Sequence, residues 1–465
     1  MVLPESFTLY TQELMGQELF SDFLSAFETE TPTSIRINRA KWDGEPVGGR
    51  QVAWCKDGYY LDRRPNFTFD PLLHAGCYYV QEASSMFVSH ALQSYTDPHR
   101  PLSVLDMCAA PGGKSTAVLS QLPPGSVMIC NEPVRQRAQI LTENLHKWGL
   151  PNTLVTNNYP DDFLKTGLTF DVIVCDVPCS GEGMFRKDEG AVGEWSVQNV
   201  EKCSQLQRSI VRTAWQLLKP GGLMVYSTCT FNTKEDEENV AWCCAQLGAE
   251  PLPVSTRTDW HITGSLLKGF PCPVYRFIPG RTTGEGIFMA VLQKPEDGDG
   301  CDKTGKKKKK CRRNDRPSAP PSCGEWLREK EKFVFDTQGD YVWAIPSDAA
   351  PLYYGAKGEL RLLKAGITMG QTKGKDLIPH QSLALSTALN PDAFTKAELT
   401  YSQAIAYLRK EPVNLPQDTP KGYVLLTFRN KPLGFVKNLG NRSNNLYPQE
   451  WKIKSSHVPE ENRVI

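Results

Sequence analysis

Between residues 100 and 294, short apolar runs rich in β-formers alternate with segments of helical periodicity. The apolar runs are LSVLDM (102–107), SVMIC (126–130), TLVT (153–156), DVIVCD (171–176), GLMVYS (222–227) and IFMAVLQK (287–294). This alternation is typical of a parallel sheet covered by helices. We therefore expect an α/β fold. In such a sheet, ligands bind in the crevice at the carboxyl ends of the strands.

Two cysteines follow two of these runs. Cys179 comes directly after Pro178, and Cys229 comes directly after Thr228. Since neighbouring parallel strands end at the same crevice, both thiols should converge there with the carboxylate of Asp176. Such a group suits covalent attack by sulfur. The alternative is inert packing of buried thiols, which the polar, turn-forming neighbours of both cysteines disfavour.

A glycine-rich loop, MCAAPGGKST (107–116), follows the first run and opens a helix. Its end resembles a P-loop, but Cys108 occupies the place where that motif needs glycine, so phosphate cradling is disfavoured. Small residues still let a ligand approach the backbone closely, namely Ala109, Ala110, Gly112 and Gly113. Glu132, just past the second run, is placed to bind ribose hydroxyls. A nucleoside without a pyrophosphate, such as S-adenosylmethionine, fits this arrangement.

Composition restricts the class of protein. The chain has 465 residues, a net charge of +1 and no run of eighteen apolar residues, so we expect no membrane span. The N-terminus has no basic, apolar signal, and fourteen cysteines then indicate free thiols in the cytoplasm. Three of them lie in a low-complexity stretch, Cys301, Cys311 and Cys323, and their spacing makes a zinc site improbable, so we expect no metal.

Outside the α/β core, four further segments are expected. Residues 1–75 form a small α/β appendage, and the core spans 76–294. In the appendage, TSIRINRAK (33–41) predicts a strand whose Arg36 and Arg39 face is either simply solvated or contacts phosphate. Residues 295–325 are a linker with five consecutive lysines, which serves as a tether, attracts a polyanion, or does both.

The C-terminal part divides into a small α+β region (326–390) and a β-rich region (391–465). In the second, basic residues are interleaved with aromatic ones. The set comprises Lys431, Lys437, Arg442, Lys452, Lys454, Phe428, Phe435, Tyr447 and Trp451. Such a mixture suits stacking on bases and contact with phosphates. A barrel core with a solvated basic rim explains the same residues.

These motifs resemble a known family. MCAAPGGKST, DVPCSGEGMFRKDE and YSTCTFN, in this order, are similar to RNA cytosine-carbon-5 methyltransferases of the Nop/Sun type. PTSIRINR, HAGCYYVQEASSM and GYVLLTFRNKPLGFVKN resemble the bacterial 16S rRNA subgroup called RsmF or YebU. The resemblance implies a Rossmann-like methyltransferase core, S-adenosylmethionine as methyl donor, and a C-terminal PUA-like RNA-binding domain.

The resemblance also implies roles for individual residues. Cys229 corresponds to the family nucleophile and Cys179 to the cysteine of product release. The chemistry of the reaction adds Lys114, as a candidate to favour the Cys229 thiolate, and Asp176, which would hold N3 or N4 of the ring. Cofactor contacts are implied for Cys108, Ala109, Ala110, Pro111, Gly112, Gly113, Lys114, Glu132, Arg137, Asn157, Asn158 and Asp176. Where many relatives carry an Asp after the third strand, this chain has Tyr159, so the choice between Asn157 and Asn158 as adenine contact stays open.

The expected reaction follows from the chemistry of cytosine. Carbon 5 becomes nucleophilic once the Cys229 thiolate adds to carbon 6, and the base must first leave its stack. We expect the partner to be RNA, with 16S rRNA as the leading candidate, and we expect the enzyme to be a monomer. Two alternatives remain: the same reaction on tRNA, and a non-catalytic RNA-binding assembly factor that retains the fold.

Overall fold

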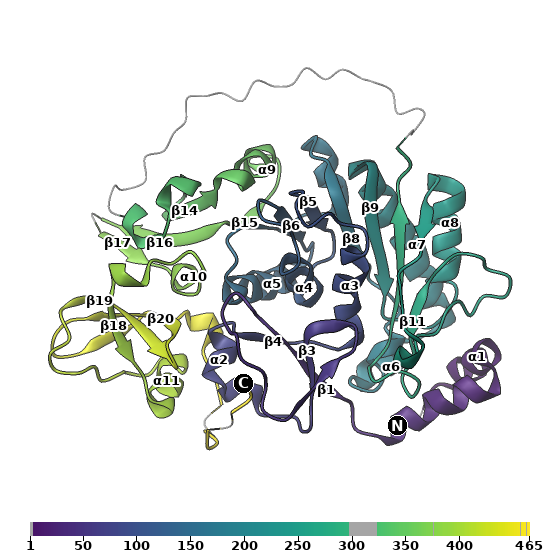
Figure 1. The fold of residues 1–465 in the computed structure, drawn as a ribbon, viewed down its shortest axis with the longest axis horizontal. Coiled ribbons are helices and arrows are strands. Elements are labelled where there is room, and N and C mark those ends of the chain that lie inside the picture. The colour runs from purple at the N-terminus through teal and green to yellow at the C-terminus, as the bar shows by residue number, and fades with distance from the viewer. Residues whose placement is uncertain (1–2, 297–322, 375, 456, 462) are drawn as a thin grey trace.

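The computed structural model describes residues 3–296, 323–374, 376–455, 457–461 and 463–465. Most of the expected linker, 295–325, therefore lies outside the described residues, as do Cys301 and Cys311. A central sheet occupies the middle of the molecule, with the N-terminal segments below it and the C-terminal segments to one side (Figure 1). In the described ranges, no helix is long and apolar enough to cross a membrane.

The central sheet has nine strands. Its main path runs in the order β10–β12–β9–β8–β5–β6–β7–β15, with β11 paired to β12. Five of these strands are mutually parallel: β5 (Ser103–Asp106), β6 (Val127–Asn131), β7 (Thr153–Thr156), β8 (Phe170–Asp176) and β9 (Leu218–Thr228). The antiparallel additions are β10 (Glu250–Leu252), β11 (Tyr275–Phe277), β12 (Ile287–Gln293) and β15 (Leu362–Ala365).

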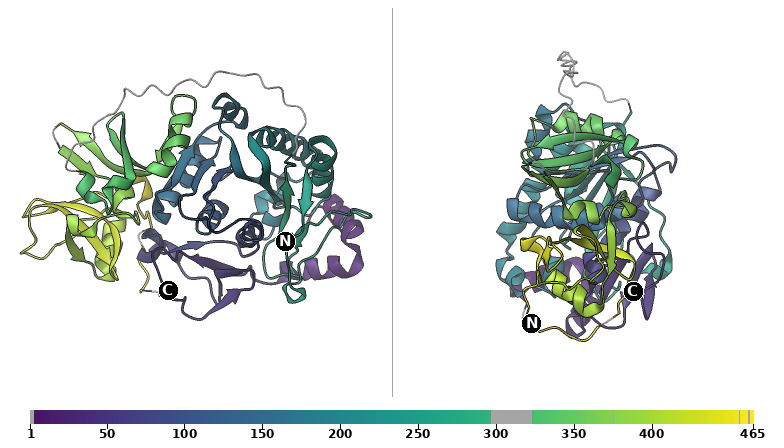
Figure 2. Two further views of the ribbon diagram at one scale, coloured as in Figure 1. Left: turned by 45° about the horizontal axis from the view of Figure 1, so that its top comes forward. Right: turned by 90° about the vertical axis from the view of Figure 1, so that its left-hand side faces the viewer.

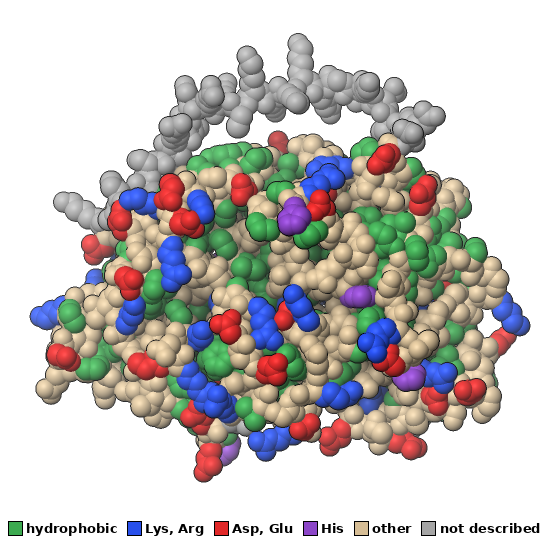
Figure 3. Space-filling model, viewed as in Figure 1, with side chains coloured by type: hydrophobic (Ala, Val, Ile, Leu, Met, Phe, Trp, Pro, Cys, Tyr) green, Lys and Arg blue, Asp and Glu red, His purple; other side chains and the backbone are tan. Residues whose placement is uncertain are grey.

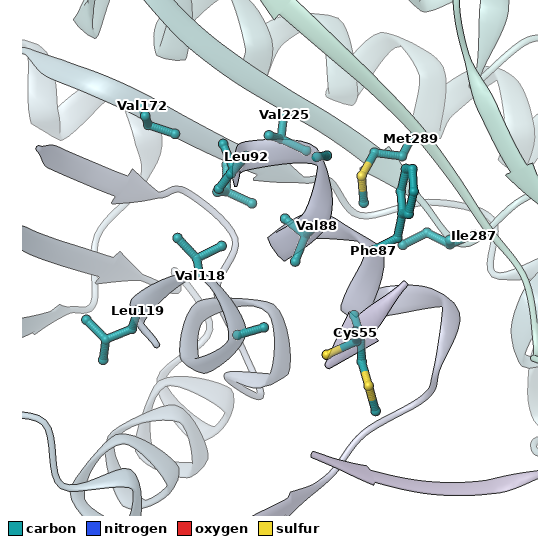
Figure 4. Close-up of a cluster of buried hydrophobic side chains, with 14 of the residues drawn as sticks. Cys55, Phe87, Val88, Leu92, Val118, Leu119, Val172, Val225, Ile287 and Met289 are labelled. Atoms are coloured by element: carbon teal, nitrogen blue, oxygen red, sulfur yellow. The ribbon is translucent and has the colours of Figure 1, made fainter. Parts of the chain in front are cut away.

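Alternate residues of the parallel strands face two different cores. On one face, Val104, Val172 and Val225 pack with α3 (Phe87–Gln93), α4 (Gly113–Leu119) and α5 (Arg135–Trp148). Figure 4 shows part of this cluster, with Val88 and Leu92 of α3 beside Val118 of α4. On the other face, the neighbouring residues pack with α7 (Val197–Leu217) and α8 (Glu237–Leu247). The expected doubly covered α/β sheet is confirmed.

The N-terminal appendage adds α1 (Glu5–Ser25), α2 (Pro71–His74) and an antiparallel sheet of order β2–β3–β1–β4. Its strands are β1 (Thr33–Ile37), β2 (Gly49–Val52), β3 (Cys55–Leu61) and β4 (Tyr78–Val80). Both interpretations of the basic face of β1 are wrong for Arg36, which is 2% exposed. Its guanidinium donates to Gln81 and to Thr116 of α4, and it stacks over Trp148.

The expected boundaries made residues 326–390 a region separate from the core. In the structure, this region is joined to the core. It contributes a sheet of β13 (Phe333–Gln338), β14 (Tyr341–Pro346), β16 (Ile367–Lys373) and β17 (Asp376–Pro379), with α9 (Ala350–Ala356) and α10 (Gln381–Ala384). The strand β15, which lies between β14 and β16 in the chain, pairs with β7 and extends the central sheet. Trp343 and Tyr353 pack into the same core as α7. A four-residue strand gave no signal of its distant partner.

The C-terminal region has a sheet of order β18–β19–β20–β21 and one helix, α11 (Tyr401–Leu408). The strands are β18 (Thr395–Glu398), β19 (Gly422–Phe428), β20 (Lys431–Asn438) and β21 (Ser443–Asn445). Phe428, Phe435 and Tyr447 are at most 5% exposed, so they belong to the core as the simpler interpretation held. Figure 2 shows this region beside the central sheet from two sides, and Figure 3 shows charges of both signs interspersed on one face.

Candidate active site

Two cysteine loops leave neighbouring strands at the carboxyl edge of the central sheet. Asp176 is the last residue of β8 and pairs in register with Ser227 of β9. Cys179 follows three residues beyond Asp176, and Cys229 directly follows Thr228, the last residue of β9. The parallel register therefore places the two loops side by side, as the sequence predicted.

The two sulfur atoms lie 2.9 Å apart. The backbone N–H of Cys229 also points to the Cys179 sulfur, at 3.4 Å. Hydrogen bonding to the Cys229 sulfur, together with burial, holds the pKa of the Cys179 thiol well above its ordinary value. Cys179 is thus a neutral thiol beside Cys229. Both cysteine residues are partly exposed and not fully buried, which argues against inert packing.

A lysine–aspartate pair stands in the same crevice. Lys114 Nζ lies 2.9 Å from Asp176 Oδ2, and Ser227 donates to Asp176 Oδ1 at 2.7 Å. Burial acts against the charge of Lys114, but Asp176 outweighs it and raises the pKa of the ammonium. Cys229 contributes in the same direction. A fixed positive charge near a thiol favours its thiolate form. All four predicted catalytic residues are therefore brought together.

Two buried glutamates lock the loops to each other. Glu182, from the Cys179 loop, accepts the backbone N–H groups of Phe231 and Asn232 at 2.6 and 3.1 Å. Glu235, from the Cys229 loop, accepts the Ser180 N–H at 3.1 Å. Each loop thus supplies a carboxylate to the other. Sequence reasoning missed both glutamates, although acidic residues that follow each cysteine motif were a visible signal.

A buried ion cluster fixes the residues on either side of Cys229. Asp236 accepts hydrogen bonds from Thr228 and Thr230 at 2.5 and 3.2 Å. Arg276 of β11 lies 2.8 Å from Asp236 and also pairs with Glu237. All three charged side chains are essentially inaccessible. Removing one partner of such a cluster would leave a buried charge uncompensated, so the backbone around Cys229 is rigidly held.

The glycine-rich loop has the shape that a closely bound nucleoside requires. Gly112 has φ +111°, a conformation that side-chain-bearing residues rarely adopt. Asp106 Oδ2 accepts the Ser115 hydroxyl at 2.7 Å, whereas its buried Oδ1 accepts no hydrogen bond within the described chain. Burial raises the pKa of Asp106 to about 7. Ala109 and Ala110 are buried and Cys108 is half-buried, so the loop presents mainly backbone.

One buried oxygen of Glu132 forms an ion pair but accepts no hydrogen bond among the described residues. The side chain is 1% exposed, and its Oε1 accepts the Val134 N–H at 2.9 Å. Oε2 accepts no hydrogen bond from the described residues and lies 3.3 Å from Arg137 Nη1. Arg137 also donates to the Ala110 carbonyl at 3.0 Å, which ties the loop to Glu132. A buried acceptor without a donor fits the ribose hydroxyls of a bound nucleoside.

The two asparagines after β7 differ in what they can still contact. Asn157 donates both amide hydrogens to backbone carbonyls, those of Glu132 and Pro133. Asn158 accepts the Arg361 N–H at 2.9 Å and donates weakly to Asp162. Asn157 therefore mainly shapes the loop, and Asn158 is the better placed of the two for a ligand. Tyr159 is 73% exposed beside them.

The appendage reaches the rim of the crevice. Glu82 Oε1 accepts the Glu285 N–H at 3.1 Å, and Tyr60 donates to the Thr283 carbonyl at 2.7 Å. Arg36 donates to Thr116 on α4, the helix whose first turn carries Lys114. The appendage thus orients both the cofactor helix and the loop after β11. Periodicity and composition alone did not reveal this contact.

Comparisons with known proteins match three segments of the chain. Residues 94–293 match the family described as 16S rRNA methyltransferase RsmB/F. Residues 3–83 match the N-terminal domain of 16S rRNA methyltransferase RsmF, and residues 394–453 match the methyltransferase RsmF PUA domain. Two relatives, both called ribosomal RNA small subunit methyltransferase F, come from Aliivibrio fischeri and Shigella boydii. They are 31% and 30% identical, and each alignment covers at least 96% of both chains.

Solved structures agree on the fold. A methyltransferase homolog from Pyrococcus horikoshii matches with a TM-score of 0.51 and 25% identity, covering 63% of this chain and all of that one. NSun6 from the same organism, solved with SFG, matches with a TM-score of 0.52 and 20% identity, covering 63% of this chain and 99% of that one. A methyltransferase fold is therefore confirmed.

Proposed function

The chain belongs to the 16S rRNA methyltransferases of the RsmB/F family, and on that premise we propose that it methylates carbon 5 of a cytosine in 16S rRNA through a covalent bond between Cys229 and carbon 6. Family membership itself makes the protein a methyltransferase of ribosomal RNA that uses S-adenosylmethionine. The target atom and the adduct are the proposal. The observation that carries it is the sulfur pair, 2.9 Å apart, beside Lys114 and Asp176.

S-adenosylmethionine, when bound, supplies the methyl group. The unsatisfied oxygens of Asp106 and Glu132, together with the backbone of the 108–113 loop, would hold its nucleoside portion. Asn158 is the proposed adenine contact. These acceptor oxygens fit a ligand with ribose hydroxyls.

Cys229 begins the reaction by adding to carbon 6 of the flipped cytosine. Its sulfur forms the new bond while the carbon 5–carbon 6 double bond shifts its electrons toward carbon 5. Asp176, held by Lys114 and Ser227, binds the N3–N4 edge of the ring, where charge develops. Lys114, whose ammonium charge both Asp176 and Cys229 support, supplies a cation near the attacking sulfur.

Cys179 acts after the methyl group has reached carbon 5. The proton on carbon 5 passes to solvent water, and the electron pair of that carbon–hydrogen bond restores the double bond between carbon 5 and carbon 6. The bond from carbon 6 to the Cys229 sulfur breaks, and its electron pair leaves with the sulfur as a thiolate. Cys179, a neutral thiol in contact with that sulfur, is placed to assist the departure. The released Cys229 thiolate then returns to its position beside Cys179.

Bisulfite sequencing of total RNA tests the proposal most directly. A strain lacking this gene should lose one or more 5-methylcytosines from 16S rRNA, and the wild-type gene should restore them. If 5-methylcytosine were lost only from tRNA, the proposed substrate would be wrong and the proposed reaction would stand. Binding of S-adenosylmethionine without methylation of any RNA would favour a non-catalytic factor. We further place the enzyme, as a monomer, in the cytoplasm where ribosomal RNA is found.

A further inference from the structure

The residues around Cys179 are held at both ends by side chains from other elements. Gln207 of α7 donates to the Pro178 carbonyl at 3.0 Å. On the other side, Glu235 accepts the Ser180 N–H at 3.1 Å and the Ser180 hydroxyl at 2.5 Å. Gln207 and Glu235 are themselves bonded, at 2.6 Å. The Glu235 carboxylate thus anchors the segment from Pro178 to Ser180, directly at Ser180 and through Gln207 at Pro178. Cys179 is the middle residue of this segment.

We propose that Glu235 is a positioning residue for product release: acting through Ser180, it holds Cys179 against the sulfur of Cys229. This inference rests on the proposed roles of the two cysteines. The Glu235 carboxylate is hydrogen-bonded to Ser180, Gln207 and Asn232 and to neither sulfur, so its effect on the reaction is indirect. Without it, Cys179 loses its register, while Cys229, fixed by Asp236 and Glu182, keeps its place.

The bonds to Glu235 require a carboxylate rather than an amide. All four of its partner groups are donors: the Ser180 N–H and hydroxyl, the Gln207 amide and the Asn232 amide, the last at 2.9 Å. A glutamine at this position would aim its own NH2 at one of these donors. Glutamine has nearly the same size as glutamate but cannot accept all four of these hydrogen bonds. Glu235→Gln therefore tests the hydrogen bonds and not the volume of the side chain.

No basic side chain pairs with Glu235 among the described residues, in contrast to the neighbouring Asp236 and Glu237. Burial accordingly raises the pKa of Glu235 to about 7. Its acidic and thiol neighbours are Glu182, Asp236, Tyr226, Cys179 and Cys203. The carboxylate that anchors Ser180 thus forms as pH rises through about 7, so release should speed up over that range.

The test separates methyl transfer from release. Purified full-length enzyme, 16S rRNA and tritiated S-adenosylmethionine are mixed under single-turnover conditions, and free methylated RNA is separated from the RNA–protein adduct on a denaturing gel. For Glu235→Gln we expect first-turnover methyl transfer to stay within about threefold of wild type. Release should slow by about tenfold, the scale of one hydrogen bond to a charged group, so adduct accumulates.

A second variant covers the case in which Glu235→Gln does not fold. Ser180→Ala removes only the hydroxyl bond and should give the same split with a smaller effect. Glu201→Gln, an exposed residue of α7, is the matched control and should behave as wild type. The wild-type release rate should rise between pH 6 and pH 8, and this rise should flatten in Glu235→Gln.

Two results would overturn the positioning role. One is wild-type release by both variants. The other is a first-turnover methyl transfer that falls as much as release, since that would indicate general damage to the site. Failure of the underlying mechanism is seen separately: Cys229→Ala would then still methylate RNA, or Cys179→Ala would form no adduct, whatever Glu235→Gln does.

Discussion

The cysteine crevice and the C-terminal sheet look alike in sequence and differ in the structure. Both mix polar and charged residues, and either cysteines or aromatic residues, with β-formers. In the crevice, the two cysteines stand just beyond strand ends, where neighbouring strands meet. They are half-buried and contact each other, beside the Lys114–Asp176 ion pair. In the C-terminal sheet, Phe428 and Phe435 stand within strands and are buried.

The difference teaches that position relative to the strand matters more than residue type. A residue past the carboxyl end of a parallel strand is held by the sheet without being covered by it. An aromatic residue inside a strand faces a core whenever that face is covered. The functional surface of the C-terminal domain must therefore come from exposed positions such as Arg442 and Lys454 rather than from its buried aromatic residues.

The strongest test of the crevice is removal of its nucleophile. Cys229→Ala should lower methyl transfer by roughly 10⁴-fold or more, as the loss of a catalytic nucleophile does elsewhere. S-adenosylmethionine binding, measured by calorimetry, should be unchanged, because the cofactor loop does not depend on this sulfur. Cys244→Ala, on α8, is the control. Full turnover by Cys229→Ala in the tritium assay would refute its role.

Removing the second sulfur should have a different signature. In the Cys179→Ala variant, Cys229 should still add to carbon 6 and the methyl group should still be transferred. Release of the methylated RNA from Cys229 should nearly stop. A slowly migrating RNA–protein species on a denaturing gel would report this. If bound RNA is methylated and no such species forms, Cys179 has no part in release.

Asp176→Asn tests the side of the crevice that binds the base. The amide keeps the size but loses the charge that Lys114 and the ring edge require, so kcat should fall by about 10²–10³-fold, as for other charge-stabilising groups. Asp259→Asn, an exposed control, should have wild-type kcat. A change in KM alone would move Asp176 from catalysis to ordinary binding.

Phe435→Ala sharpens the contrast from the other region. Because Phe435 is 1% exposed and packs against Phe394, its removal should lower the free energy of unfolding by about 3–5 kcal/mol. Chemical denaturation measures this, and Trp451→Ala, half-buried at the edge, should cost less. A stable Phe435→Ala variant with weakened RNA binding would instead restore the stacking interpretation.

The smallest expected effect comes from the exposed cations of the C-terminal domain. Arg442→Ala with Lys454→Ala should raise KM for rRNA a few-fold and reduce the salt dependence of binding by about one ion per lost phosphate contact. The kcat value should not change. Filter binding at several salt concentrations measures this. An unchanged slope would place the RNA on another surface.

The sequence was sufficient for the core and for the positions of the four residues that we propose to be catalytic. Strand ends, helix periodicity and the two cysteine motifs determine where Cys179, Cys229, Asp176 and Lys114 lie, because all four depend on local elements and parallel register. The supporting residues were harder to predict. The contacts through which these residues act join positions 45 to 80 residues apart, and no local pattern encodes such a contact. The residues are Arg36, Glu182, Glu235 and Arg276.

The same limit explains the domain boundaries. Composition separates residues 326–390 from the core, and yet β15 completes the central sheet by pairing with β7 across some two hundred residues. Short strands carry weak signals, and the partner of an edge strand is chosen by the assembled sheet. The sequence also left open the choice between Asn157 and Asn158, because their backbone partners, on which our proposal of Asn158 depends, have no local signal.

The shared apolar cluster of Ile35, Ile37, Val424, Val464 and Ile465 joins the N-terminal appendage to the C-terminal region. Each of these two parts completes its interior only with side chains from the other. We therefore expect neither to fold stably when it is separated from its counterpart, because separation would leave apolar surface open to proteolysis.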